Sequence, residues 1–160
     1  MVNANHELEP FYTLRRAAAF AAAALLSAAC TEAPRADPGN RDQVARGQRV
    51  YEAQCAACHG ARLEGQPNWR ERLPSGRFPA PPHDATGHTW HHSDQLLFNI
   101  TKYGIERYAP PDYESDMPAF GGALSDDDIW AVLAYIKSTW PEETRKWQAE
   151  VNREDARVRR

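Results

Sequence analysis

The stretch Cys55-Ala56-Ala57-Cys58-His59 decides which fold this chain adopts. Two cysteines separated by two residues and followed at once by a histidine form the attachment motif of a covalently bound haem. One turn of helix can present both sulfurs to the edge of a porphyrin and the imidazole to its face. We therefore predict one haem c, bound through thioethers to Cys55 and Cys58, with His59 as a proximal ligand of the iron.

Two other interpretations of the motif are a thioredoxin-like dithiol and half of a zinc site. A redox dithiol is typical of a βαβ context, which the sequence does not indicate. A zinc site needs a second pair of cysteines or histidines of matching type. The motif by itself leaves both interpretations open, but it favours haem.

Met117 is the second candidate ligand of the iron. It lies in the segment Met117-Pro118-Ala119-Phe120, between Asp116 and the pair Gly121-Gly122. A single methionine is commonly a filler of the hydrophobic core. No helical pattern explains this one as core, and its thioether could reach the face of the iron opposite His59.

With these motifs in this order, the chain resembles the class I cytochrome c family, single-haem electron carriers with His/Met ligation. The matching segments are Cys55 to His59, Gly65-Gln66-Pro67, Met117 to Phe120 and a closing helix over residues 124–137. The resemblance covers roughly residues 40–140. It implies a small all-α fold whose helices wrap around one covalently attached haem. It also implies that the backbone carbonyl of Pro67 accepts a hydrogen bond from the far nitrogen of His59.

The composition of the chain argues against some classes of function. The chain has 160 residues and a net charge of -3, from 19 basic and 22 acidic residues. Mixed charges of this kind argue against nucleic-acid binding. A domain of about 100 residues that is rich in proline buries only a thin core, so we expect the apoprotein to be poorly folded.

The chain divides into four parts on the sequence alone. Residues 1–29 carry Arg15 and Arg16 before an apolar run, which predicts an export signal too short to cross a bilayer. Residues 30–40 are expected to form a flexible tether, 41–140 the cytochrome domain, and 141–160 a charged C-terminal helix or tail.

The predicted location is periplasmic, or otherwise outside the cytoplasmic membrane. Cys30 lies at a possible lipoprotein processing site, so a lipid anchor is one expectation. Ordinary cleavage after small residues and an uncleaved anchor remain the alternatives.

Three helices are predicted from capping signals. The first is capped by Asn40 or Asp42 and runs to about residue 53, the second begins after Ser93 and stops at Gly104, and the third begins after Ser125 and stops before Pro141. A glycine inside the first helix costs about 1 kcal/mol relative to alanine.

Gly47 therefore calls for a packing reason. The resemblance implies that Gly47 and Tyr51 meet Val132 and Tyr135, because the first and last helices cross closely.

A long irregular loop over residues 68–92 carries four histidines near its end: His83, His88, His91 and His92. These could bind copper or zinc, or one could replace Met117 as a ligand of the iron. We favour contacts with haem propionates and turns, since no cysteine or carboxylate pattern joins them. Trp90 has an indole N–H that could donate to a propionate.

The function predicted is outer-sphere transfer of one electron between redox partner proteins that the sequence does not identify. Two ligands leave no open position on the iron, which argues against an enzyme. The alternatives are a haem subunit of a dehydrogenase or oxidase, a peroxidase-like protein in which Met117 dissociates, and a metal-binding module built on the histidine cluster.

Overall fold

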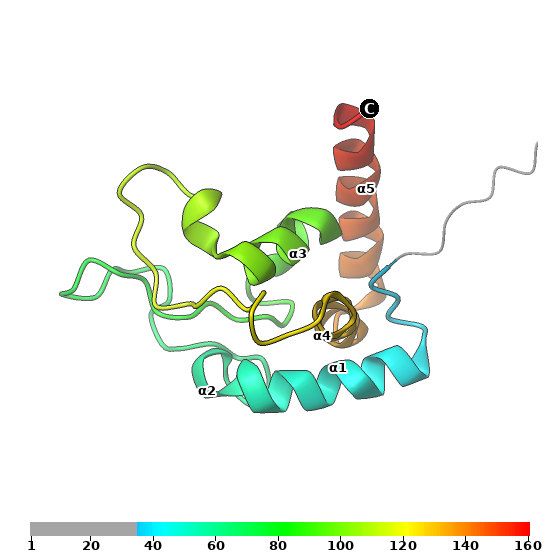
Figure 1. Cartoon of the computed structure of the whole chain (residues 1–160), viewed down its shortest axis with the longest axis horizontal. Coiled ribbons are helices and arrows are strands. Elements are labelled where there is room, and N and C mark those ends of the chain that lie inside the picture. The colour runs from blue at the N-terminus through cyan, green and yellow to red at the C-terminus, as the bar shows by residue number, and fades with distance from the viewer. Residues whose placement is uncertain (1–34) are drawn as a thin grey trace, which may run out of the picture. The chain divides into compact units, whose positions relative to one another are not determined.

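The computed structural model describes residues 35–160, and this part of the chain is helical without strands. The predicted export segment and Cys30 lie outside the described residues. The elements are α1 (Arg41–Gln54), α2 (Ala56–His59), η1 (Thr89–His91), α3 (Asp94–Tyr103), η2 (Ile105–Arg107), α4 (Asp126–Ser138) and α5 (Glu142–Val158). The all-α prediction is confirmed (Figure 1).

Side-chain caps begin the three predicted helices where the sequence places them. Asn40 Oδ1 accepts from the backbone N–H of Gln43 at the start of α1. Ser93 caps α3, which ends at Gly104, and Ser125 caps α4 in a reciprocal capping box with Asp128. Each cap satisfies backbone donors that have no partner within the helix.

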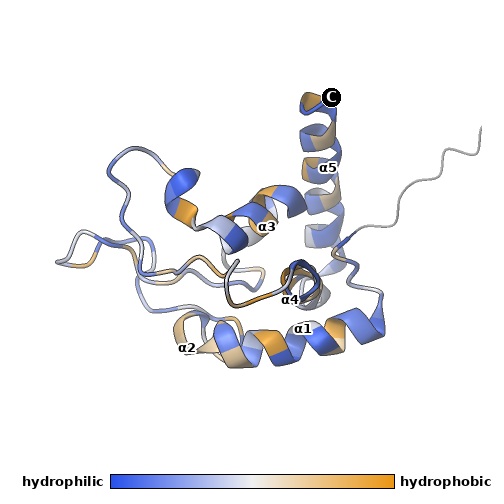
Figure 2. Ribbon diagram, in the orientation of Figure 1, coloured by the Kyte–Doolittle hydropathy of each residue, from blue (hydrophilic) through white to orange (hydrophobic). Residues whose placement is uncertain are grey.

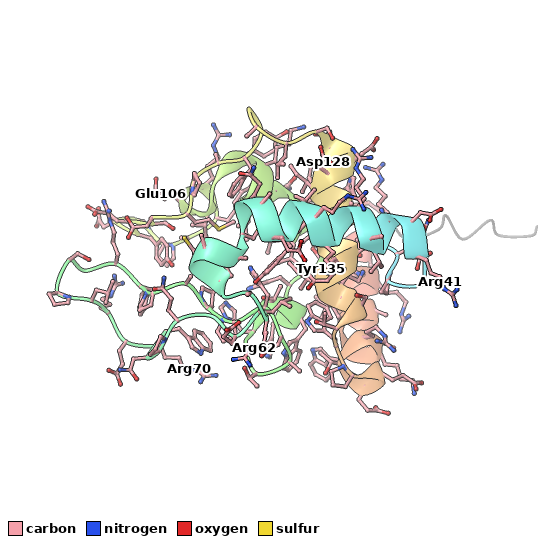
Figure 3. The ribbon with its side chains drawn as sticks, turned by 90° about the horizontal axis from the view of Figure 1, so that it is seen from below. Arg41, Arg62, Arg70, Glu106, Asp128 and Tyr135 are labelled. Atoms are coloured by element: carbon pink, nitrogen blue, oxygen red, sulfur yellow. The ribbon has the colours of Figure 1, made fainter. Side chains whose placement is uncertain are left out.

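α1 lies across α4 (Figure 1). Gly47 lies where the two helices cross. A Cβ on Gly47 would overlap the carbonyl oxygen of Ala131 and would lie 2.9 Å from Cβ of Tyr135. Figure 3, which looks onto α1, shows Tyr135 where the two helices pass each other. The predicted reason for a glycine in this helix is therefore confirmed: it permits close approach of two backbones.

Two hydrophobic clusters form the core, and α4 contributes to both. The first joins α3 to α4 and comprises Ala36, Leu97, Phe98, Ile129, Trp130, Leu133 and Ala134. The second comprises Tyr51, Leu63, Val132, Ile136 and Trp140, with Cys55, Ala56 and Trp90 packed against it. The second cluster thus supports the haem motif, because Cys55 and Ala56 pack against it.

The predicted tether is partly wrong. Ala36 is fully buried in the first cluster, and the backbone N–H of Asp37 donates to Gln43 Oε1 at 2.9 Å. The chain from residue 35 onward therefore packs on the domain and does not act as a flexible tether.

α5 is attached to the rest of the domain more closely than the predicted charged helix or tail. Its surface is largely hydrophilic (Figure 2), but Gln148 is only 1% exposed. The Gln148 amide donates to Asp94 Oδ1 at 2.6 Å, and Asn152 accepts from the backbone N–H of Asp94 at 2.7 Å. Lys137 donates to the other oxygen of Asp94 at 2.6 Å. This buried network fixes α5 to the start of α3.

The segment between α2 and η1 has no helix but a defined path. Gly65 has φ +68°, and a Cβ there would lie 2.7 Å from the carbonyl carbon of Pro81. The chain therefore folds back on itself, with the N–H of Gln66 donating to Ala80 O at 2.9 Å and that of His83 to Leu63 O at 2.8 Å. Within residues 35–160, no helix has the length and apolar character needed to cross a membrane.

Candidate haem site

The haem motif lies at the junction of two helices. Cys55 ends α1 and begins α2, and its carbonyl accepts from the backbone N–H of His59 at 2.9 Å. Tyr51, fully buried one turn earlier, donates its hydroxyl to Gly60 O at 2.9 Å. The single turn of α2 is therefore held at both ends, so that both cysteines and the histidine are presented together, as the spacing predicts.

The two thiols differ in environment. Cys55 is half-buried against the second core cluster, whereas Cys58 is exposed. Burial, and then the neighbouring Cys58, raise the pKa of the Cys55 thiol to about 11. Both sulfurs are free in the described structure, with no disulfide between them. They are available for the two thioether bonds of a haem.

His59 is buried, at 7% exposure, and its ring is oriented by one hydrogen bond. Nδ1 lies 2.8 Å from the carbonyl oxygen of Pro81, and because a carbonyl can only accept, Nδ1 carries the proton. Nε2 therefore keeps its lone pair, as a metal ligand requires. Burial lowers the pKa of His59, against the Pro81 bond that raises it, and the neutral ring is the ligating form.

The acceptor predicted from the family resemblance, Pro67, is wrong. The structure gives this bond to Pro81, because the fold-back at Gly65 brings residues 80–82 to the haem motif. The physical role is the one expected: such a bond fixes the tautomer of a ligating imidazole and increases its donor strength.

His83 contacts the face of the His59 ring. The two ring centroids are 3.9 Å apart and the planes differ by 24°. His83 Nδ1 is 2.9 Å from Thr89 Oγ1, within hydrogen-bond distance. Burial, followed by the nearby imidazoles of His59 and His88, holds the pKa of His83 well below its ordinary value, so this ring is neutral at neutral pH.

The buried indole N–H of Trp90 has no acceptor among the described residues. Its indole packs against the second core cluster, as Cys55 does, and stacks on His91 at 3.8 Å. Nε1 is buried, yet it has no hydrogen-bond partner among the described residues. A buried donor without an acceptor is costly. A haem propionate would satisfy it, so this residue and the motif together fit a haem.

The four histidines of the long loop have different neighbours. His88 stacks on Trp69 at 5.3 Å, His91 stacks on Trp90, and His83 faces His59. Nowhere in residues 35–160 do three His, Cys, Asp or Glu side chains lie together so as to hold a metal.

Met117 lies in an irregular loop that is braced on both sides. Its backbone N–H donates to Ser115 Oγ at 3.0 Å, and Arg77 pairs with Asp116 just before it. After it, the N–H of Phe120 donates to Thr101 O at 2.9 Å, which ties the loop to α3. Met117 itself is half-buried. Its ligation of the iron stays a prediction.

Sequence reasoning missed three residues that shape the site: Tyr51 as a brace of α2, Pro81 as the acceptor from His59, and His83 as the stacking partner. Only Pro81 had a local signal, since a proline next to a proline favours an extended backbone with a free carbonyl.

Comparison with known proteins agrees with this geometry. The family model described as Cytochrome c matches residues 44–140. A thiosulfate dehydrogenase of Stutzerimonas stutzeri (strain A1501) is 33% identical over 95 residues, which cover 59% of this chain and 27% of that protein. The chain thus spans about a quarter of the length of this relative. No solved structure matches significantly. By its family match, its helical fold and its attachment motif, the chain belongs to the cytochrome c family, whose members carry electrons on a covalently bound haem.

Proposed function

We propose that this protein is a single-haem electron carrier that works outside the cytoplasmic membrane, with His59 and Met117 as the two axial ligands. Cys55 and Cys58 hold the haem by thioethers, Pro81 orients His59, and Trp90 donates to a propionate. When bound, the haem supplies the one-electron Fe(III)/Fe(II) couple. The observation that carries the proposal is the neutral, oriented His59 directly beside two available thiols.

The protein's own contribution is to keep the iron site nearly unchanged between oxidation states. His59 is buried and held by Pro81 and His83, so its ring has little room to move. A thioether from Met117 would stabilise the reduced ion and raise the potential. With both ligands in place, the haem would supply one-electron transfer without binding a substrate; of the two cysteines that would hold it, Cys58 is exposed.

The deciding experiment is spectroscopy of the protein expressed with haem-maturation machinery. We expect covalently bound haem and a weak near-infrared Met-to-iron band in the oxidised protein. Met117→Ala should abolish the band, lower the potential and admit carbon monoxide or cyanide. Cys55→Ala with Cys58→Ala should abolish covalent haem. An oxidised spectrum that is identical in Met117→Ala would place the second ligand elsewhere.

A second candidate is a haem subunit or domain of an enzyme, and the similarity to a thiosulfate dehydrogenase favours it. Purified protein given thiosulfate and an artificial electron acceptor separates the two functions. A carrier accepts electrons only from a reduced partner and gives no turnover. Sustained turnover that is lost in Met117→Ala or His59→Ala would make the protein an enzyme.

Anchoring through a lipidated Cys30 completes the proposal. Mass spectrometry of the mature protein distinguishes a lipid on Cys30 from ordinary cleavage.

A further inference from the structure

His83 is the only histidine in the described residues whose ring stacks on His59. Its distance of 3.9 Å and angle of 24° describe two nearly parallel rings in contact. The hydrogen bond from His59 to Pro81 does not define the plane of the ring by itself, because bonds to a carbonyl tolerate a broad range of angles. A flat neighbour on one face restricts the rotation that remains.

His83 can restrict another ring because its own position is fixed at three points. Its backbone N–H donates to Leu63 O at 2.8 Å. Its carbonyl accepts from the indole Nε1 of Trp140 at 2.8 Å, and Trp140 is 2% exposed in the core. Its ring nitrogen Nδ1 lies 2.9 Å from Oγ1 of Thr89, which is also buried.

We propose that His83 is a positioning residue that sets the plane of the proximal imidazole, through the stack on His59 and the hydrogen bond with Thr89. This rests on the proposed function, in which His59 binds the iron. A ligating imidazole that turned about its bond to iron would redistribute electron density over the porphyrin. His83 prevents that turning and so keeps one electronic state of the oxidised protein.

The test uses the oxidised holoprotein and two readouts of the ligand plane: the electron paramagnetic resonance g-values and the spread of the haem-methyl proton shifts. His83→Ala should shift the g-values and change the spread, because the stack is lost. His83→Phe keeps a flat ring and should return both readouts towards the parent. Thr89→Val removes the hydrogen bond to His83 at nearly constant side-chain volume. It should shift both readouts in the same direction as His83→Ala does, but by a smaller amount.

His88→Ala is the matched control, because this imidazole stacks on Trp69 and not on His59. It should leave both readouts unchanged. If His83→Ala does not fold, Thr89→Val carries the test. Unchanged g-values and methyl shifts in a folded His83→Ala or Thr89→Val would overturn the proposal, as would a His83→Phe protein that shifts as far as His83→Ala. Absence of covalent haem in the parent would instead refute the proposed function.

Discussion

Gly47 of α1 and Ala131 of α4 are in backbone contact, so closely that a Cβ on Gly47 would overlap the carbonyl oxygen of Ala131. The obstruction is backbone, which cannot turn aside as a flexible side chain can. Two helices far apart in the sequence are thereby locked at one point. The packing of Tyr51 on Tyr135, with ring centroids 5.4 Å apart, continues the same contact one turn along α1.

Substituting Gly47 tests this crossing. Gly47→Ala should lower the free energy of unfolding of the holoprotein by about 1–2 kcal/mol, because overpacking outweighs the gain in helix propensity. Denaturant titration followed by circular dichroism measures it. Gly122→Ala is the control, since a Cβ there meets nothing within 4 Å. Equal stability of the Gly47→Ala and parent proteins would mean that the helices separate freely.

The buried pair of Lys137 and Asp94 gives a second prediction. Their side chains are 7% and 14% exposed, so removing one charge leaves the other in the interior. Lys137→Met should cost about 3 kcal/mol of unfolding free energy, and Asp94→Asn in the same chain should restore part of it. Lys146 and Glu142 form an exposed ion pair, with side chains 62% and 70% exposed. Lys146→Met removes this pair and should change the free energy of unfolding by less than about 0.5 kcal/mol.

Removing the Trp90 N–H should change the reduction potential. Trp90→Phe keeps an aromatic ring but withdraws the donor that we propose for a haem propionate, and the negative charge of the propionate would then favour Fe(III). We expect a lower potential in equilibrium titration of the holoprotein. Trp147→Phe alters a neighbouring indole that is 57% exposed and should leave the potential unchanged. A potential of Trp90→Phe equal to the parent's would assign the buried N–H to some other acceptor.

Acid should destabilise the protein through His88 and His92. Burial, and then neighbouring imidazoles, lower the pKa of both residues in the folded state. Between that lowered pKa and the ordinary value near 6.5, the unfolded chain binds more protons than the folded one. Stability therefore falls as the pH is lowered through this window. His88→Gln with His92→Gln should lose less stability between pH 7 and pH 5 than the parent, as measured by denaturant midpoints. An identical pH dependence would show that neither histidine contributes.

The helix ends could be predicted from sequence because their signals are local. Ser93 and Ser125 cap α3 and α4, and Gly104 ends α3. α4 ends at Ser138, before the predicted stop at Trp140, and Pro141 is the N-cap residue of the next helix. Gly47 was predictable for a related reason: a costly residue inside a helix indicates a compensating contact.

Contacts between residues far apart in the sequence were not predictable in the same way. Pro67 and Pro81 are both prolines with free carbonyls, and the choice between them depends on a left-handed turn at Gly65 that folds the loop back. The attachment of α5 was missed because it depends on polar residues, Gln148 and Asn152, whose burial only the tertiary structure reveals.

The crossing of α1 and α4 also orders the assembly of this protein in time. Arg46 donates to Asp128 across a separation of 82 positions, so this contact joins parts of the chain that lie far apart in the sequence. Closing so long a loop is a late and entropically costly step. Cys55 and Cys58 lie at the C-terminal end of α1 and just after it, so we expect them to be accessible to haem-attachment machinery until that loop closes. We therefore expect the contact between α1 and α4 to form after the haem has been attached.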